Sequence, residues 1–123
     1  MTRLIFRLSF FIAFAAISYL ALAPITETPV STGWDKLNHA TAFFCLLLLM
    51  SLGFPYKPSF WSKVALLFAY GVAIEVAQSF IPPREPSLLD LVANGCGLAL
   101  YVFVRPLVQR FFPVAHANVS NAG

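Results

Sequence analysis

The stretch "EVAQSFIPPREPSLLDLVAN", Glu75 to Asn94, decides the fold, because it ends one apolar segment, turns through a proline-rich loop and begins another. It also carries Glu75, Glu85 and Asp90, which are three of the five acidic residues in the chain. Elsewhere the chain is strongly apolar, with 59% hydrophobic residues, 11% charged residues and a mean hydropathy of +0.80. A soluble domain carries about a quarter charged residues, and a small domain cannot bury this many apolar ones. The composition therefore predicts an integral membrane protein.

Four apolar segments are long enough to cross a bilayer, whose hydrocarbon core of about 30 Å takes about 20 helical residues. Prolines flank these segments, in positions where they end a helix rather than break it. The predicted spans are residues 4–23, 37–54, 64–81 and 88–104. We therefore expect an all-α fold, an integral-membrane four-helix bundle that forms one domain over residues 1–106, with Pro106 beyond the last span.

The two ends of the chain carry further signals. Arg3 and Arg7, an apolar run and "ALA" at 21–23 are similar to a secretory signal peptide, but Pro24 directly after them is a poor cleavage context. We expect an uncleaved first helix. Residues 107–123 begin with the apolar, basic "LVQRFFPV" and end in small polar residues, which favours an interfacial and then disordered cytoplasmic tail.

The distribution of Lys and Arg predicts the orientation. From the amino end through the three loops to the tail, the counts are two, one, two, one and two, the middle loop holding Lys57 and Lys63 and the tail Arg105 and Arg110. This pattern places both termini and the middle loop in the cytoplasm of a multi-pass protein of the bacterial cytoplasmic (inner) membrane. It also accounts for the net charge of +3, so no nucleic-acid partner is expected.

Polar side chains are concentrated in the halves of the segments that face the outer side. They come in pairs spaced three or four residues apart, so that each pair lies on one helix face. The pairs are Asp35 with His39, Glu75 with Gln78, and Asp90 with Asn94. Three helices can therefore present polar groups to one shallow, outward-open pocket.

Small residues accompany the polar pairs. One turn deeper on the same faces lie Ala42, Gly71 and Gly97, which allow neighbouring helices to approach or leave room beneath the polar layer. An alanine stripe on another face of the third segment predicts close helix packing, with that helix at the centre of the bundle. The stripe consists of Ala65, Ala69, Ala73 and Ala77.

Structural roles compete with functional ones at most of these positions. Asp35 and Asp90 suit helix caps, and Asn94 and Gln78 suit hydrogen bonds between helices. Glu75 fits such a role poorly, because it lies near the carboxyl end of its helix, where the dipole disfavours an anion. A charge at membrane depth costs about 3 kcal/mol or more without a partner. We therefore expect Glu75 to be neutral, or paired with His39 or with Arg84.

Arg84 lies in the loop "IPPREPS" between the third and fourth segments. Prolines at 82, 83 and 86 restrict the backbone of this loop. This stiffness favours a fixed position for the guanidinium over the pocket.

Three motifs, "DKLNH" at 35–39, "EVAQSFIPPR" at 75–84 and "DLVANGCG" at 90–97, resemble those of the VanZ-like family of small bacterial membrane proteins. The resemblance covers about half of the chain and departs from the family pattern at Phe44 and Tyr101. The matching residues are Asp35, Lys36, His39, Glu75, Gln78, Pro83, Arg84, Asp90, Asn94 and Gly97. The resemblance implies four spans and a role at the cell envelope, in a family associated with resistance to the glycopeptide teicoplanin, but it implies no mechanism.

Three hypotheses follow for the polar cluster. In the first, it binds an anionic lipid headgroup or a lipid-linked envelope precursor through Asp35, Lys36, Gln78, Arg84 and Asn94, near two helix amino ends suited to anions. In the second, the protein is an intramembrane enzyme whose catalytic residues are His39, Glu75 and Asp90. In the third, the cluster only specifies helix packing.

No cofactor or metal site is expected. The alternative, within the enzyme hypothesis, is a hard divalent cation held by Asp35, Glu75 and Asp90. Zinc is disfavoured, because the second histidine, His116, lies in the predicted tail.

Overall fold

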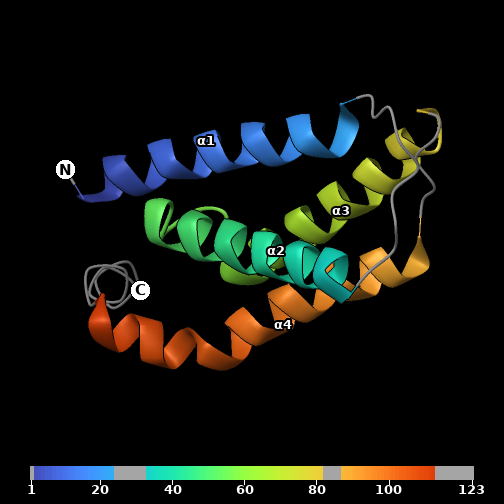
Figure 1. Ribbon diagram of the computed structural model, residues 1–123. Coiled ribbons are helices and arrows are strands. Elements are labelled where there is room, and N and C mark those ends of the chain that lie inside the picture. The colour runs from blue at the N-terminus through green and yellow to red at the C-terminus, as the bar shows by residue number, and fades with distance from the viewer. Residues whose placement is uncertain (1, 24–32, 82–86, 113–123) are drawn as a thin grey trace.

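The computed structural model describes residues 2–23, 33–81 and 87–112, with the backbone alone at 33–35. Over these ranges the protein is all-helical and contains no strand (Figure 1). The helices are α1 (Thr2–Leu22), α2 (Gly33–Gly53), α3 (Phe60–Gln78) and α4 (Leu88–Phe111). All four are long enough and apolar enough to cross a membrane, which indicates a multi-pass membrane protein and confirms the predicted number of helices.

The helix ends follow local sequence signals. Ser59 caps α3, since its side-chain oxygen accepts a hydrogen bond from the Ser62 backbone N–H at 3.3 Å. Ser87 occupies the corresponding position before α4 with an extended backbone, φ −132° and ψ 128°. Gly53 ends α2, just before the proline-containing connection to α3.

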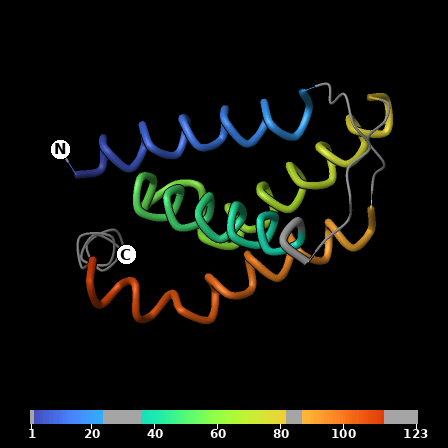
Figure 2. The backbone as a smooth tube through the Cα atoms, viewed as in Figure 1, coloured from blue at the N-terminus to red at the C-terminus, as the bar shows by residue number. Residues whose placement is uncertain are grey.

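Successive helices run in opposite directions, so their ends gather at two ends of the bundle (Figures 1 and 2). We call the end where α1 and α3 finish and α2 and α4 begin the polar end. The opposite end, where α1 and α3 begin and α2 and α4 finish, is the basic end. The predicted polar residues that the structure describes therefore meet at one end because the chain alternates direction, although Lys36 and Asn94 are 58 residues apart.

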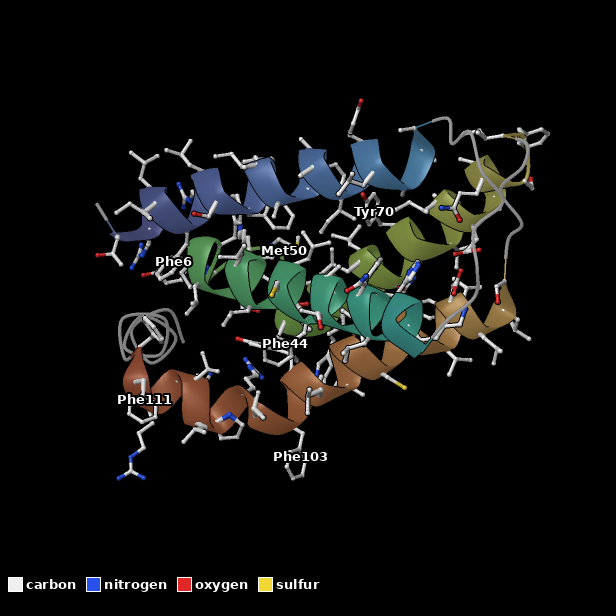
Figure 3. The ribbon with its side chains drawn as sticks, viewed as in Figure 1. Phe6, Phe44, Met50, Tyr70, Phe103 and Phe111 are labelled. Atoms are coloured by element: carbon white, nitrogen blue, oxygen red, sulfur yellow. The ribbon has the colours of Figure 1, made fainter. Side chains whose placement is uncertain are left out.

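The core is centred on α2 rather than on α3, so the prediction of a central third helix is wrong. Leu46 and Leu47 of α2 are 0% exposed, and α2 has its most extensive contacts with α4 and α1. The ring of Phe44 in α2 lies 5.7 Å from that of Tyr101 in α4, measured between centroids. In Figure 3, Phe44 points between the helices, whereas Phe103 points away from the bundle into the space that lipid would fill.

Glycines allow the helices to approach closely. A Cβ at Gly97 would lie 2.1 Å from the carbonyl oxygen of Ala40, so α2 and α4 are in backbone contact there. A Cβ at Gly71 would lie 3.0 Å from Asn94 Nδ2. Both findings confirm the prediction that small residues bring helices together beneath the polar layer.

The alanine stripe does not mediate packing within the chain, contrary to prediction. Ala65, Ala69 and Ala73 are exposed. The buried face of α3 runs instead through Leu67, Gly71 and other residues spaced three or four apart. Spacing alone indicated that the alanines share a face, but which face turns inward is decided by the larger apolar and polar side chains opposite.

The last helix is longer than predicted. Pro106 lies inside α4, which continues to Phe111, so the prediction that the helix ends before Pro106 is wrong, and residues 107–111 of the predicted tail are helical. The carboxyl-terminal part of α4 turns away from the direction of its first part (Figure 2), as a proline within a helix causes. Prolines are tolerated inside such helices because the freed backbone groups find other partners.

Candidate functional site

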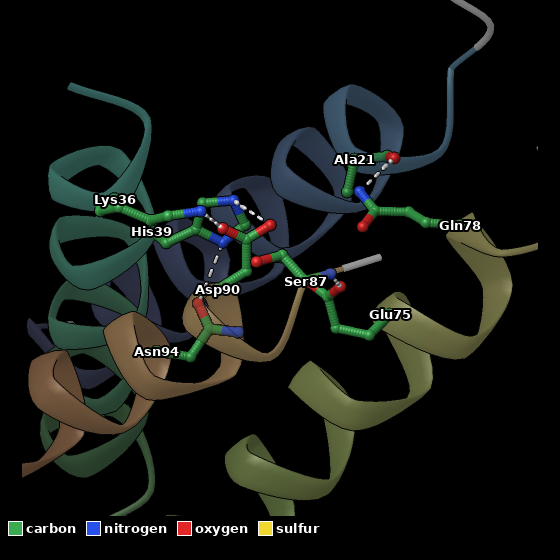
Figure 4. Close-up of polar contacts among 8 residues, drawn as sticks. All are labelled: Ala21, Lys36, His39, Glu75, Gln78, Ser87, Asp90 and Asn94. Carbon is green, nitrogen blue, oxygen red and sulfur yellow. Dashed lines mark hydrogen bonds and ion pairs between the residues drawn. The ribbon is translucent and has the colours of Figure 1, made fainter. Parts of the chain in front are cut away.

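A network of polar side chains joins α2 to α4 at the polar end (Figure 4). The Lys36 ammonium forms a hydrogen bond and an ion pair with the Asp90 carboxylate. His39 Nδ1 lies 3.1 Å from Asn94 Oδ1, and His39 Nε2 lies 3.9 Å from Asp90 Oδ2. Two residues on one face of α2 therefore meet two residues on one face of α4.

The local sequence explains this meeting. Lys36 and His39 are three residues apart, and Asp90 and Asn94 are four apart, so each pair occupies adjacent turns of its helix. The contact of Gly97 with Ala40 brings the two backbones together one turn deeper. Asn94 is 1% exposed, and its buried side-chain oxygen finds a partner in His39.

Glu75 contributes a buried carboxylate from α3. Its Oε2 accepts a hydrogen bond from the Ser87 backbone N–H at 2.9 Å, at the amino end of α4. This N–H is one of the donors that a helix leaves without an intrahelical partner, so the carboxylate is placed at the positive end of the α4 dipole. Glu75 Oε1 is buried and has no hydrogen-bond partner in the part of the chain that the structure describes.

A backbone group at the beginning of α4 therefore contacts Glu75, whereas Arg84, one of its two expected partners, lies outside the described residues. No hydrogen bond or ion pair joins Glu75 directly to His39 among the described residues. The negative end of the α3 dipole disfavours the Glu75 carboxylate, and the positive end of the α4 dipole offsets this effect.

Gln78 connects α3 to α1. Its Nε2 donates a hydrogen bond at 2.9 Å to the carbonyl oxygen of Ala21, in the last turn of α1 (Figure 4). The last carbonyls of a helix lack intrahelical partners, so this side chain satisfies one of them. The first helix thus becomes part of the site, a role that the sequence analysis did not assign to it.

A pocket of about 340 Å³ opens beside this network. Its polar lining residues are Asn38, His39, Gln78 and Asn94. The remaining lining is apolar: Ile17, Leu20, Ala21, Ala42, Phe43 and Ile74. The pocket is therefore amphiphilic, since it offers both hydrogen-bonding groups and hydrocarbon surface. We call it the polar-end pocket.

The side chains of two predicted site residues are not placed by the structure. Arg84 and the side chain of Asp35 lie outside the described residues. Among the residues that are described, no group of three His, Cys, Asp or Glu side chains could hold a metal ion. Lys36, His39, Glu75, Gln78, Asp90 and Asn94 all lie at the polar end.

The sequence analysis missed a second set of charged side chains, at the basic end. Lys63 was assigned to a loop and Arg105 to the tail, but both lie within helices and line another pocket. Lys63 is only 3% exposed. The signal was present in the spacing, since Lys63, Leu67 and Gly71 repeat every four residues on one helix face.

Comparisons with known proteins give limited information. No family model matches the chain, and no solved structure matches it. A protein of the fission yeast Schizosaccharomyces pombe, named "Uncharacterized protein C11E3.10", is 35% identical over 99 residues. The match covers 76% of this chain and 59% of that protein, so the chain spans about three fifths of its relative's length. The relative's name assigns no activity, and its source is eukaryotic.

Proposed function

We propose that this chain binds the headgroup of a membrane lipid, or of a lipid-linked envelope precursor, in the polar-end pocket. The observation that carries the proposal is the amphiphilic lining of this pocket at the end of four membrane-length helices. A lipid likewise combines hydrogen-bonding groups at one end with hydrocarbon beyond them. Small-molecule sites typically combine an apolar lining with a few placed polar groups, as this one does.

The apolar lining supports a ligand with a hydrocarbon portion. Ile17 and Leu20 come from α1, and Leu20 is 68% exposed outside the bundle, so this part of the lining continues to the lipid-facing surface. A headgroup held against His39 and Gln78 can therefore leave its acyl chain in the bilayer. The acyl chain then does not have to leave the bilayer for water, which lowers the free-energy cost of binding.

The charges of the network define which part of a headgroup it suits. Asp90 is paired with Lys36, and Glu75 is not part of the pocket lining. The lining groups are the two amides of Asn38 and Asn94, the amide of Gln78 and the imidazole of His39, which suit hydroxyl and amide groups of a ligand. In our proposal the anionic part of the headgroup is held by Arg84, which the sequence places in the loop that joins α3 to α4.

We further propose that the protein belongs to the VanZ-like family and acts at the bacterial cell envelope. The motifs "DKLNH", "EVAQSFIPPR" and "DLVANGCG" support this assignment. The distribution of Lys and Arg supports an orientation with both termini cytoplasmic and the polar end outside. A contribution to glycopeptide resistance is part of the same proposal.

The proposal is tested by identifying lipids retained through gentle detergent purification, using native mass spectrometry followed by lipid extraction. The wild type should retain a lipid that His39→Ala and Gln78→Leu lose by about tenfold or more, because each removes a hydrogen-bonding group of the lining. His116→Ala is the control of the same residue type, outside the described residues. Equal retention by all of these proteins would contradict the proposal.

An intramembrane enzyme is a second candidate, favoured by the position of His39 on the pocket wall with its Nε2 3.9 Å from Asp90 Oδ2. A carboxylate beside an imidazole orients it for proton transfer to a bound ligand. In this case Asp90→Asn should abolish conversion of the retained lipid while leaving lipid retention within about twofold. Absence of any product with the wild-type protein would reject this candidate and leave binding alone.

A further inference from the structure

The basic end holds a pocket of about 270 Å³ between the carboxyl-terminal halves of α2 and α4 and the beginning of α3. Its polar lining includes Ser51, Tyr56, Ser59, Lys63, Arg105 and Gln109. It shares no lining residue with the polar-end pocket. We call it the basic-end pocket.

Lys63 is the unusual member of this lining. The residue is 3% exposed, but its ammonium forms neither a hydrogen bond nor an ion pair with any described residue. Buried charges in proteins are normally paired, since an uncompensated one is costly. A lysine can keep its stem in apolar surroundings and place its ammonium in a polar space, and here that space is the pocket.

The surroundings add positive charge instead of neutralising it. The Arg105 guanidinium lies over the ring of Phe60, 3.8 Å from its centroid, and lines the same pocket. Ser59 and Phe60 bring the amino end of α3, which is the positive end of a 19-residue helix dipole. The carboxylates whose side chains are described, Glu75 and Asp90, lie at the polar end.

We propose that the basic-end pocket binds a phosphate group carried by a membrane phospholipid headgroup. An ammonium, a guanidinium, a helix amino end and hydroxyl donors together are the groups that bind phosphate in proteins. The pocket lies towards the ends of α2 and α4 and the beginning of α3, and the ends of helices that span a bilayer lie near its headgroup layer. Basic pockets between spanning helices commonly bind anionic headgroups in this way.

The apolar part of the lining favours a lipid over a free anion. Leu52, Pro55 and Val108 share the pocket with the charged groups. Trp61, next in sequence to the lining residue Phe60, is 65% exposed. An exposed tryptophan is typical of the interface between hydrocarbon and headgroups. A phosphodiester linked to a glycerol backbone would place its apolar part against these residues.

The test measures binding of phosphatidylglycerol and of phosphatidylcholine to the purified full chain by native mass spectrometry from mixed micelles. The wild type should prefer phosphatidylglycerol. Lys63→Gln and Arg105→Gln should each weaken phosphatidylglycerol binding by about tenfold, because each removes a charge-assisted hydrogen bond. Lys63→Arg should retain most of the binding, and circular dichroism verifies that each variant is folded.

Matched controls separate a built site from general attraction between positive charge and anionic lipid. Lys57→Gln and Arg110→Gln are the controls for Lys63→Gln and Arg105→Gln. Each removes one positive charge from an exposed residue of the same type, five or six positions away in the sequence. They should leave phosphatidylglycerol binding within about twofold. Equal losses in Lys57→Gln and Lys63→Gln, or no preference for phosphatidylglycerol over phosphatidylcholine, would overturn the proposal.

A competition arm distinguishes a lipid from a free anion. Inorganic phosphate at millimolar concentration should displace little phosphatidylglycerol if the lipid's apolar part contributes to binding. If inorganic phosphate displaces phosphatidylglycerol from the wild type but not from Lys63→Gln, the pocket binds the free anion. That result would overturn the proposal that its ligand is a lipid. The residues tested here are absent from the polar-end pocket, so the result is independent of the function proposed for that pocket.

Discussion

At the scale of single residues, the buried charged side chains at the two ends of the bundle differ in their partners. At the polar end, Lys36 and Asp90 satisfy each other, and Glu75 receives a backbone N–H. At the basic end, Lys63 is buried beside another cation and has no acidic partner among the described residues. The Lys36–Asp90 pair holds α2 and α4 together, whereas the uncompensated charge of Lys63 favours the binding of an external anion.

The Lys36–Asp90 pair should be measurably stabilising, because both side chains are largely withdrawn from solvent, at 27% and 11% exposure. We predict that Asp90→Asn lowers the free energy of unfolding by about 1–3 kcal/mol. A double-mutant cycle with Lys36→Met, measured by reversible unfolding in mixed micelles, should give a coupling of about 1 kcal/mol. Additive single effects would show that the pair contributes nothing, and Lys57→Met, at an exposed position, is the control.

Lys63 should have the opposite effect on stability. In neutral detergent, where no anion fills the basic-end pocket, we predict that Lys63→Met raises the free energy of unfolding by about 1 kcal/mol, since it replaces an uncompensated buried charge with an apolar chain. Added phosphatidylglycerol should stabilise the wild type more than this variant. Thermal unfolding with and without the lipid measures both effects, and destabilisation by Lys63→Met in neutral detergent would contradict the account.

At the scale of elements, the packing of α2 against α4 depends on glycine positions that spacing in the sequence already indicated. Gly97 lies against the Ala40 carbonyl, and Gly71 lies against Asn94 and Phe43. The alanine stripe of α3 shows the limit of such reasoning, because periodicity identifies a face without identifying what covers it. Ala65 and Ala69 are exposed, while Lys63, on the opposite side of α3, is buried.

Gly97→Ala should disrupt the contact between α2 and α4, since its Cβ would lie 2.1 Å from the Ala40 carbonyl oxygen and backbone atoms cannot yield cheaply. We predict a loss of about 1–3 kcal/mol in the free energy of unfolding. Gly95→Ala is the matched control, because the nearest atom to its Cβ would be Phe68 Cε2 at 3.9 Å. Similar stabilities for the two variants would contradict the described packing.

The parts of the fold that could be predicted from the sequence are those set by composition and local spacing. Membrane-length apolar segments predicted four helices, and polar pairs at three- and four-residue spacing predicted which residues share a face. Continuation of α4 through Pro106 could not be predicted, because a proline's cost depends on whether tertiary neighbours satisfy the freed carbonyl. The partner of Glu75 was equally hidden, since a backbone N–H carries no signal in sequence.

At the scale of the whole molecule, the alternation of helix direction separates two chemically different ends. α1 and α3 finish where α2 and α4 begin (Figure 1). The described carboxylates, Glu75 and Asp90, therefore lie at one end, and Lys63 and Arg105 lie at the other. By the positive-inside rule, this asymmetry favours the orientation proposed above, with the basic end in the cytoplasm.

This orientation predicts which positions an impermeant maleimide labels in intact cells. After Cys45 and Cys96 are replaced by serine, Ser79→Cys at the polar end should be labelled from outside, and Lys57→Cys at the basic end should be labelled only after the membrane is permeabilised. Both positions are exposed in the structure. The reverse pattern would contradict the proposed orientation, while leaving the bundle and its pockets unchanged.

A structure determined with native lipids retained would show whether the polar-end pocket holds a lipid headgroup, as we propose. We expect elongated density whose polar part contacts His39 and Gln78 and whose apolar part follows Ile17 and Leu20 towards the bilayer. A pocket filled by neighbouring side chains or by water alone, with lipid density confined to outward-facing surfaces such as that of Phe103, would contradict it.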